Sequence, residues 1–129
     1  MPVWGDVKVE IVNHNLEVPL PFLGTFDAVV SCFAIHHLTH ERKRQLYEEI
    51  WTVLESTGIF CNLEHVASVS RSAHERFLQA IGITSAEEYR SNKLLDVHTQ
   101  LEWLREIGFV DVDCYWKCAS WLFSWAANR

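Results

Sequence analysis

Residues that could bind a small ligand or move a proton follow two apolar runs of the sequence. The first set is Ser31, Cys32, Phe33 and Ala34, and the second set is Asn62, Leu63, Glu64 and His65. In an open α/β sheet, ligands bind beyond the carboxyl ends of the strands. We therefore expect the two sets to line one crevice. The simpler alternative is that the aromatic side chains belong to the core and the polar ones cap strand ends.

The histidines raise the possibility of a metal site. An H-H-x-x-H string is formed by His36, His37 and His40, and the groups that could meet it at the same sheet edge are His65, Glu64, Cys32 and Cys61. Zinc accepts such nitrogen, sulfur and oxygen ligands. The metalloprotease motif H-E-x-x-H is absent, however, so we expect no metal. The remaining histidines are interpreted as ordinary surface or capping residues: His14, His74 and His98.

Cys32 could act as a nucleophile if His36 or His65 drew off its proton. Nothing in the neighbouring sequence supplies an oxyanion hole or a third, orienting group. The pattern therefore favours a buried, inert thiol at this position.

The composition is that of a single globular domain. The chain has 129 residues, 49% of them hydrophobic, which is enough to bury a core without disulfides. A net charge of -6 and scattered basic residues disfavour nucleic-acid binding. The four cysteines lack the paired CxxC spacing of zinc ribbons and suit free thiols in a reducing cytoplasm. No apolar run is long enough to span a membrane. We expect a cytoplasmic protein that binds neither nucleic acid nor membranes.

The first half of the chain predicts a strand, helix, strand unit. Residues 7–12 alternate between apolar and polar types and predict a strand, and residues 16–25 hold Pro19, Pro21 and Gly24, which predict a loop. Residues 26–32 are consecutively apolar in their middle and predict a central strand covered on both faces. Thr39 is a candidate N-cap for a helix over residues 40–55, and residues 59–63 predict the next buried strand.

The expected helix over residues 40–55 has two faces. Its apolar positions recur at helical spacing and should pack on the sheet: Leu46, Ile50, Val53 and Leu54. Its charged positions should face water: Glu41, Arg42, Arg44 and Glu48.

The second half predicts helices followed by a hairpin. Ser70 or Ser72 could cap one helix, Thr84 with Glu87 opens a short one to about Arg90, and Thr99 with Glu102 precedes a third that Gly108 ends. Alternation over residues 110–116 and a last strand over residues 120–126 predict a β-hairpin. The expected fold is therefore α/β, with helices flanking an incomplete sheet that ends in an antiparallel hairpin.

Three segments in this order resemble class I S-adenosylmethionine-dependent methyltransferases. They are Phe-Asp-Ala-Val-Val-Ser from Phe26, Ala-Ile-His-His-Leu from Ala34, and Val-Leu-Glu-Ser-Thr-Gly-Ile-Phe from Val53. The run from Leu101 to Val112 is similar to the helix and strand that precede the last strand of that family. The resemblance implies a Rossmann-like sheet and S-adenosylmethionine as the cofactor.

The resemblance also implies where the ligands bind. The cofactor-binding residues it implies are Asn15, Ser31, Cys32, Phe33 and Ala34, and the residues it implies on the acceptor side are His36, Asn62, Glu64 and His65. Two features depart from the family. Asn15 stands where an Asp usually reads the adenine amino group, and Thr57 stands in a turn that is usually Lys-Pro-Gly-Gly, where a β-branched residue requires another shape or strain.

The family's glycine-rich loop and its ribose-binding acidic residue have no counterpart in this sequence. The five glycines never form a G-x-G-x-G cluster. We therefore expect a truncated methyltransferase-like domain without independent catalysis. Two alternatives stay open: an active methyltransferase of a small molecule, completed by dimerisation or by a separate N-terminal half, and a metal- or ligand-binding module.

Self-association is the partner interaction that the sequence favours. In an incomplete sheet, the strand over residues 26–32 would present an open apolar edge, which recruits another chain. A homodimer could form through this edge or by exchange of residues 7–12. The aromatic residues of the C-terminal third, Trp103, Trp116, Trp121 and Trp125 among them, suit either core packing or an interface.

Overall fold

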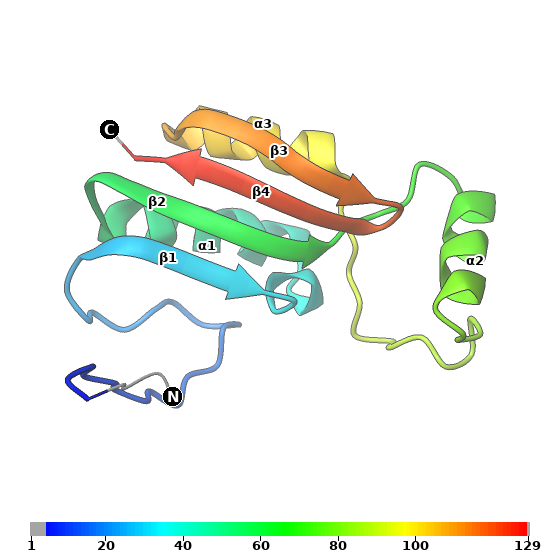
Figure 1. Ribbon diagram of the computed structural model, residues 1–129, viewed down its shortest axis with the longest axis horizontal. Helices are drawn as coiled ribbons and strands as arrows, with labels where there is room; N and C mark the ends of the chain where they lie inside the picture. Colours follow the sequence, from blue (N-terminus) through cyan, green and yellow to red (C-terminus); the bar gives the residue numbers. More distant parts are fainter. Residues whose placement is uncertain (1–4, 129) are drawn as a thin grey trace.

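The computed structural model describes residues 5–128 and contains a mixed α/β fold (Figure 1). The strands are β1 (Phe26–Cys32), β2 (Leu54–His65), β3 (Val110–Cys118) and β4 (Trp121–Ala127). The helices are the short 3-10 helix η1 (Ile35–His37) and the α-helices α1 (His40–Val53), α2 (Arg71–Ala80) and α3 (Val97–Ile107). No helix within this part of the chain is both long and apolar enough to cross a bilayer.

The four strands form one sheet in the order β1-β2-β4-β3. β1 runs parallel to β2, and the crossover between them contains η1 and α1. β4 lies antiparallel to both β2 and β3, so the C-terminal hairpin is confirmed. The expected α/β class, with flanking helices and an incomplete Rossmann-like sheet, is confirmed as well.

One face of the sheet packs on α1 and α3, which lie side by side behind it in Figure 1. The core includes Leu46 and Ile50 of α1, Leu104 of α3, and Phe60 and Ala126 of the sheet, all almost fully buried. Alternate residues of β2 and β4 point into this core, as the two-residue period of a strand requires.

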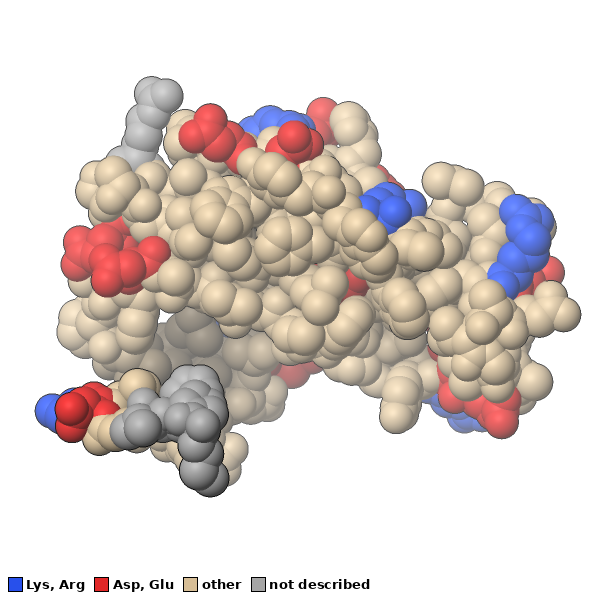
Figure 2. All heavy atoms as spheres, in the orientation of Figure 1, with Lys and Arg blue, Asp and Glu red and all other residues tan. Residues whose placement is uncertain are grey.

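The opposite face of the sheet carries apolar side chains without a covering helix. Val30 pairs with Cys61, which pairs with Trp125, and Leu63 pairs with Phe123, so these five side chains share that face. We call it the open face. Val30 is 72% exposed. Figure 2 shows this side of the molecule, with charged groups around its margins and a largely uncharged centre.

The structure corrects two predictions about strands, one about the existence of a strand and one about its place in the sheet. Residues 7–12 form no strand, and Val9 and Ile11 are 78% and 92% exposed. Residues 26–32 do form β1, but β1 is an edge strand with mostly exposed residues, not a central strand covered on both faces. Its only partner in the described part of the chain is β2.

Several boundaries also differ from the sequence-based prediction. α1 ends at Val53, and β2 takes up residues 54–65 instead of 59–63. Residues 84–90 form turns rather than a helix, although Glu87 does accept hydrogen bonds from the backbone and hydroxyl of Thr84. The caps Thr39, Ser70 and Gly108 are confirmed, whereas Asp96 rather than Thr99 caps α3.

The departure from the family at Thr57 is accommodated with strain. Thr57 has φ +71°, in the left-handed region that β-branched residues avoid. The next residue has to be glycine, because a Cβ on Gly58 would lie 2.8 Å from the carbonyl oxygen of Glu55. The β1–β2 register shifts at this point, between Phe26 and Ala28.

Candidate functional site

A buried histidine and glutamate pair lies at the carboxyl end of the parallel strands. Nδ1 of His36 is 2.6 Å from Oε1 of Glu64. The same carboxylate oxygen accepts the backbone N–H of His65 at 2.8 Å. Because a carboxylate only accepts, Nδ1 of His36 donates, and in the neutral imidazole Nε2 is then the nitrogen with a lone pair. That arrangement gives His36 the form of a general base.

Strand periodicity and Lys93 hold this pair in place. Glu64 is fully buried because it belongs to the residues of β2 that face the helices. His36 is buried on η1, where its carbonyl accepts the backbone N–H of Lys93 at 2.8 Å. Lys93 also donates from Nζ to the carbonyl of His37 at 2.9 Å. The loop before α3 therefore fixes η1 against the sheet.

A pocket of about 290 Å³ opens beside His36. We call it the acceptor pocket. It is lined by aromatic and apolar side chains, by histidines and by a few polar groups: Phe33, His36, His37, His65, Phe77, Leu78, Ile81, Ile83, Glu88, Tyr89, Asn92 and Trp121. Such a mixture suits a small, mostly apolar molecule that carries one proton to be removed.

The other two histidines of this pocket are held in the neutral form. Burial and the nearby His36 lower the pKa of His65, although the carboxylates of Glu88 and Glu64 oppose this. Burial and His36 lower the pKa of His37 in the same way, and Ser91 lies 3.0 Å from its Nδ1. At neutral pH these imidazoles contribute polar atoms to the pocket without adding positive charge.

A second, smaller pocket of about 260 Å³ lies on the other side of the end of β1. Ser31, Cys32 and Ala34 line it together with apolar residues of β1 and α1, and with Leu16 and Leu20 of the preceding loop. We call it the β1 pocket. The two pockets are separated by the turn at Phe33, whose φ is +49° and whose N–H donates to the carbonyl of Leu63.

Comparison with known proteins shows which proteins the chain is similar to. The family model described as "Methyltransferase domain" matches residues 3–62. Many solved methyltransferases share the fold of almost the whole chain. These findings support a class I methyltransferase family for the chain, and its fold is methyltransferase-like. No curated protein matches the sequence.

Three solved structures illustrate the likeness. An O-methyltransferase family protein from Burkholderia thailandensis has a TM-score of 0.68 at 14% identity, covering 92% of this chain and 35% of its own. Human N-acetylserotonin methyltransferase, solved with S-adenosylmethionine, has a TM-score of 0.59 at 15% identity, covering 88% and 31%. The carbon methyltransferase CurJ has a TM-score of 0.60 at 19% identity, covering 89% and 34%. The chain thus spans about one third of each neighbour.

The β1 pocket meets only part of what the cofactor of this methyltransferase family requires. Its polar side chains are Ser31 and Cys32, and none of its lining residues is a carboxylate that could accept hydrogen bonds from both ribose hydroxyls. Asn15 lies in the loop just before Leu16, and its Oδ1 already accepts the N–H of Glu17 at 3.0 Å. The described residues therefore do not fit the whole of S-adenosylmethionine.

The structure brings most of the predicted site residues to one end of the sheet. Ser31 pairs with Asn62 and Cys32 pairs with Leu63, so the two sets at the strand ends are adjacent. Phe33 lines the acceptor pocket rather than the β1 pocket, and Cys32 is exposed rather than buried. His40 is exposed on α1 and does not join the other histidines in a ligand cluster.

Sequence reasoning missed the contribution of the segment after β2. Phe77 of α2, and Glu88 and Tyr89 of the following turns, line the acceptor pocket. His74 was interpreted as a surface residue, yet its Nε2 lies 2.9 Å from Glu88. These contacts join residues far apart in sequence, so no local sequence pattern predicts them.

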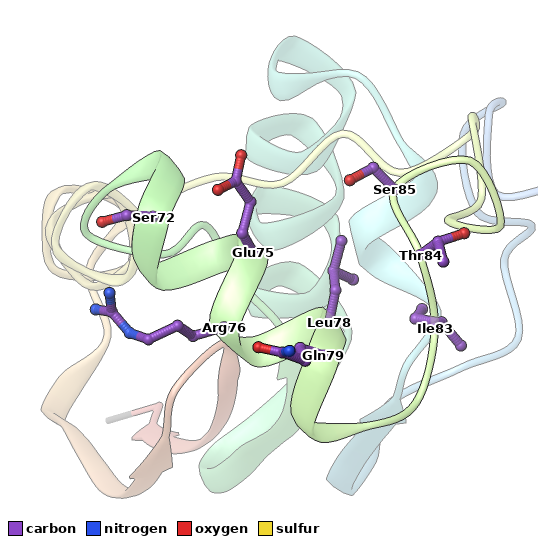
Figure 3. A pocket seen from close by; sticks show the side chains of 8 residues that line it. All are labelled: Ser72, Glu75, Arg76, Leu78, Gln79, Ile83, Thr84 and Ser85. Atoms are coloured by element: carbon purple, nitrogen blue, oxygen red, sulfur yellow. The ribbon is translucent and has the colours of Figure 1, made fainter.

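A third hollow, of about 520 Å³, lies on the outer side of α2 and is formed by Ser72, Glu75, Arg76 and their neighbours (Figure 3). The charged groups of Glu75 and Arg76 point in different directions there. Its polar groups do not converge on one point, and we assign it no function.

Proposed function

We propose that this chain forms the acceptor side of an S-adenosylmethionine-dependent methyltransferase, and that it does not methylate an acceptor by itself. The observation that carries the first part is the His36–Glu64 pair in the wall of the acceptor pocket. The observation that supports the second part is the lack of a carboxylate in the β1 pocket.

His36 has the role of the base. Methyl transfer requires an acceptor atom that has given up its proton, and Nε2 of His36 can take that proton from a hydroxyl or an acidic C–H group. Glu64 then stabilises the imidazolium through Nδ1, from which it is 2.6 Å away. Phe33, Phe77 and Trp121 shape the pocket for a small aromatic molecule.

The open face and the free edge of β1 support the second part of the proposal. Doubly wound sheets carry helices on both faces, whereas α1 and α3 cover one face only. A strand added beside β1, followed by a helix on the open face, would complete the layers. We infer that such a unit, contributed by polypeptide other than residues 5–128, supplies the cofactor's ribose contacts.

The cofactor part of the proposal is tested by calorimetric titration of the purified chain with S-adenosylmethionine and S-adenosylhomocysteine. We expect no heat of binding and no thermal shift with either. Binding of either compound to the chain alone would overturn the inference that other polypeptide supplies the ribose contacts.

The acceptor part of the proposal is tested separately, with phenol as the probe. Imidazole ¹⁵N spectra of the chain should show the His36 signals shifting as phenol is added, and the exposed His98 serves as the internal control. Equal responses of His36 and His98, or no response of His36 at high phenol concentration, would contradict the assigned pocket.

A further inference from the structure

We propose that His65, His74 and Glu88 form a binding site for a divalent transition metal, with Zn²⁺ as the ion of choice. One ligand atom from each residue lies within 4.8 Å of the other two. The three side chains come from the end of β2, the middle of α2 and the turns after α2. This is not the H-H-x-x-H string that the sequence singled out.

The pair formed by His74 and Glu88 supplies two of the three ligands already in contact. Nε2 of His74 lies 3.0 Å from Oε1 and 2.9 Å from Oε2 of Glu88, so it bisects the carboxylate. Both side chains are about four-fifths buried, at 23% and 20% exposure. A mostly buried pair of this kind keeps its geometry better than a surface pair does.

His65 is the observation that separates a metal site from a simple ion pair. Its Nε2 is buried and has no hydrogen-bond partner among the described residues. Its ring stacks on that of His74, with centroids 6.4 Å apart and an angle of 25° between the planes. A buried imidazole nitrogen without a partner is costly, and a metal ion held jointly with His74 and Glu88 would satisfy it.

The surroundings also suit a metal. Nδ1 of His74 lies 3.5 Å from the Ser68 hydroxyl, on the ring edge opposite the ligand atom, where metal-binding histidines usually have an orienting partner. Phe77 packs against the rings of both His65 and His74 and shields them from solvent. Zinc favours two imidazoles with one carboxylate, and three protein ligands leave a position open.

The open position has a defined neighbour, because His65 and Glu88 both line the acceptor pocket. A small oxygen ligand in that pocket could complete the coordination of the ion. Only this last step depends on the proposed function, since binding of the metal itself requires no cofactor and no acceptor.

The site is tested by titrating the chelator-treated chain with Zn²⁺ in a calorimeter and with Co²⁺ by visible absorption. We expect one ion per chain, with the absorption bands of a low-coordinate cobalt site. His74→Ala and Glu88→Gln should each weaken zinc binding by more than about tenfold. The matched control is His98→Ala, which removes the exposed His98–Glu102 pair (3.2 Å) and should leave binding unchanged.

Two results would overturn the site. One is a wild-type chain that binds neither ion in the micromolar range, and the other is binding that Glu88→Gln and His98→Ala reduce equally. Because Glu88→Gln is nearly isosteric, circular dichroism should show it folded. The thermal midpoint of the unmutated chain provides a second readout: Zn²⁺ should raise it and a chelator should reverse the rise. Neither result bears on whether S-adenosylmethionine binds.

Discussion

The two sides of the site differ in how they are held. On the acceptor side, Glu64 and His36 are buried, and the loop before α3 is fixed to η1 by backbone and side-chain hydrogen bonds. On the cofactor side, Val30 of β1 is 72% exposed, and residues 5–15 form neither helix nor strand. In the proposed function, hydrogen bonds between described residues therefore hold the acceptor side in place, whereas the cofactor side has exposed, unpaired surface.

The difference follows from the position of each strand in the sheet. β2 has neighbours on both edges, β1 and β4, and residues on alternate positions reach a core formed by two helices. β1 has β2 alone. Arg42 and Glu49 of α1 compensate for this, because their hydrogen bonds tie the loop before β1 to α1. We expect changes there to damage the cofactor side more than any change of surface charge.

Arg42→Ala should have the largest effect. Arg42 is 5% exposed and donates to the carbonyls of Leu16 and Val18 and to both carboxylate oxygens of Glu49, at 2.6–3.0 Å. Glu49 also accepts the N–H of Leu20 at 3.0 Å. Removing the guanidinium leaves these groups unpaired and should lower the free energy of unfolding by about 3 kcal/mol, measured by urea denaturation.

The control for that change is Arg44→Ala. Arg44 pairs with Glu106 at 2.7 Å, but its side chain is 36% exposed. Its loss should cost less than about 1 kcal/mol. Equal costs for Arg42→Ala and Arg44→Ala would show that the loop before β1 is not held by Arg42 and Glu49.

Local signals in the sequence were sufficient to find most of the fold. The side chains of Thr39 and Ser70 accept backbone N–H groups where α1 and α2 begin. Gly108 ends α3 with φ +127°, a conformation that glycine tolerates best. The apolar period of α1 and the alternation in the hairpin depend on residues close in sequence, and they correctly predicted these elements.

What the sequence did not reveal depends on contacts between distant residues. The alternation of residues 7–12 is typical of a strand, but a strand needs a partner and the described chain offers none there. Arg42 was expected to face water because its neighbours on the helix are charged, yet its partners Leu16 and Val18 lie on another segment. The same holds for His74 and Glu88 of the candidate site.

Lys43→Met tests the loop that closes the acceptor side, through the pH dependence of stability. Lys43 is 1% exposed, and its Nζ donates to the carbonyls of Leu38 and Lys93. Burial, with a smaller effect of Lys93, lowers the pKa of Lys43 to about 8, although Glu64 opposes the shift. Between that pH and the ordinary value near 10.5, the unfolded chain binds more protons, so stability should rise with pH.

The rise should amount to about 2 kcal/mol in the wild-type chain and should be missing from Lys43→Met. The unfolding free energies of the two proteins are measured between pH 7.5 and 10.5, at steps of about one pH unit. Their difference is compared at each pH, because the titration of the other lysines cancels in it. A parallel pH dependence in the two proteins would mean that Lys43 is not the buried cation that closes this loop.

Tyr47→Phe tests whether α3 supports the same side. The Tyr47 hydroxyl is buried and donates to Oε1 of Gln100 at 2.6 Å, and Gln100 in turn donates to the carbonyl of Leu95. Burial raises the pKa of Tyr47, so it remains neutral and keeps this hydrogen bond. Its loss should cost about 1 kcal/mol in thermal or urea unfolding. The exposed Tyr89→Phe is the control and should cost nothing measurable.

Val30→Lys should change stability least and yet change the state of association most. Val30 is on the open face of the edge strand, 72% exposed, so a lysine there should alter the unfolding free energy by less than about 0.5 kcal/mol.

We propose that the isolated chain forms a homodimer through the β1 edge, because an unpaired apolar edge recruits a second strand. Sedimentation velocity at micromolar concentration should then show a dimer for the wild type and a monomer for Val30→Lys. Tyr115→Lys, a change at an exposed residue of β3 at the opposite edge of the sheet, should remain dimeric. A monomeric wild type would mean that β1 stays unpaired in solution, and a dimer that Tyr115→Lys disrupts instead would place the contact on the hairpin.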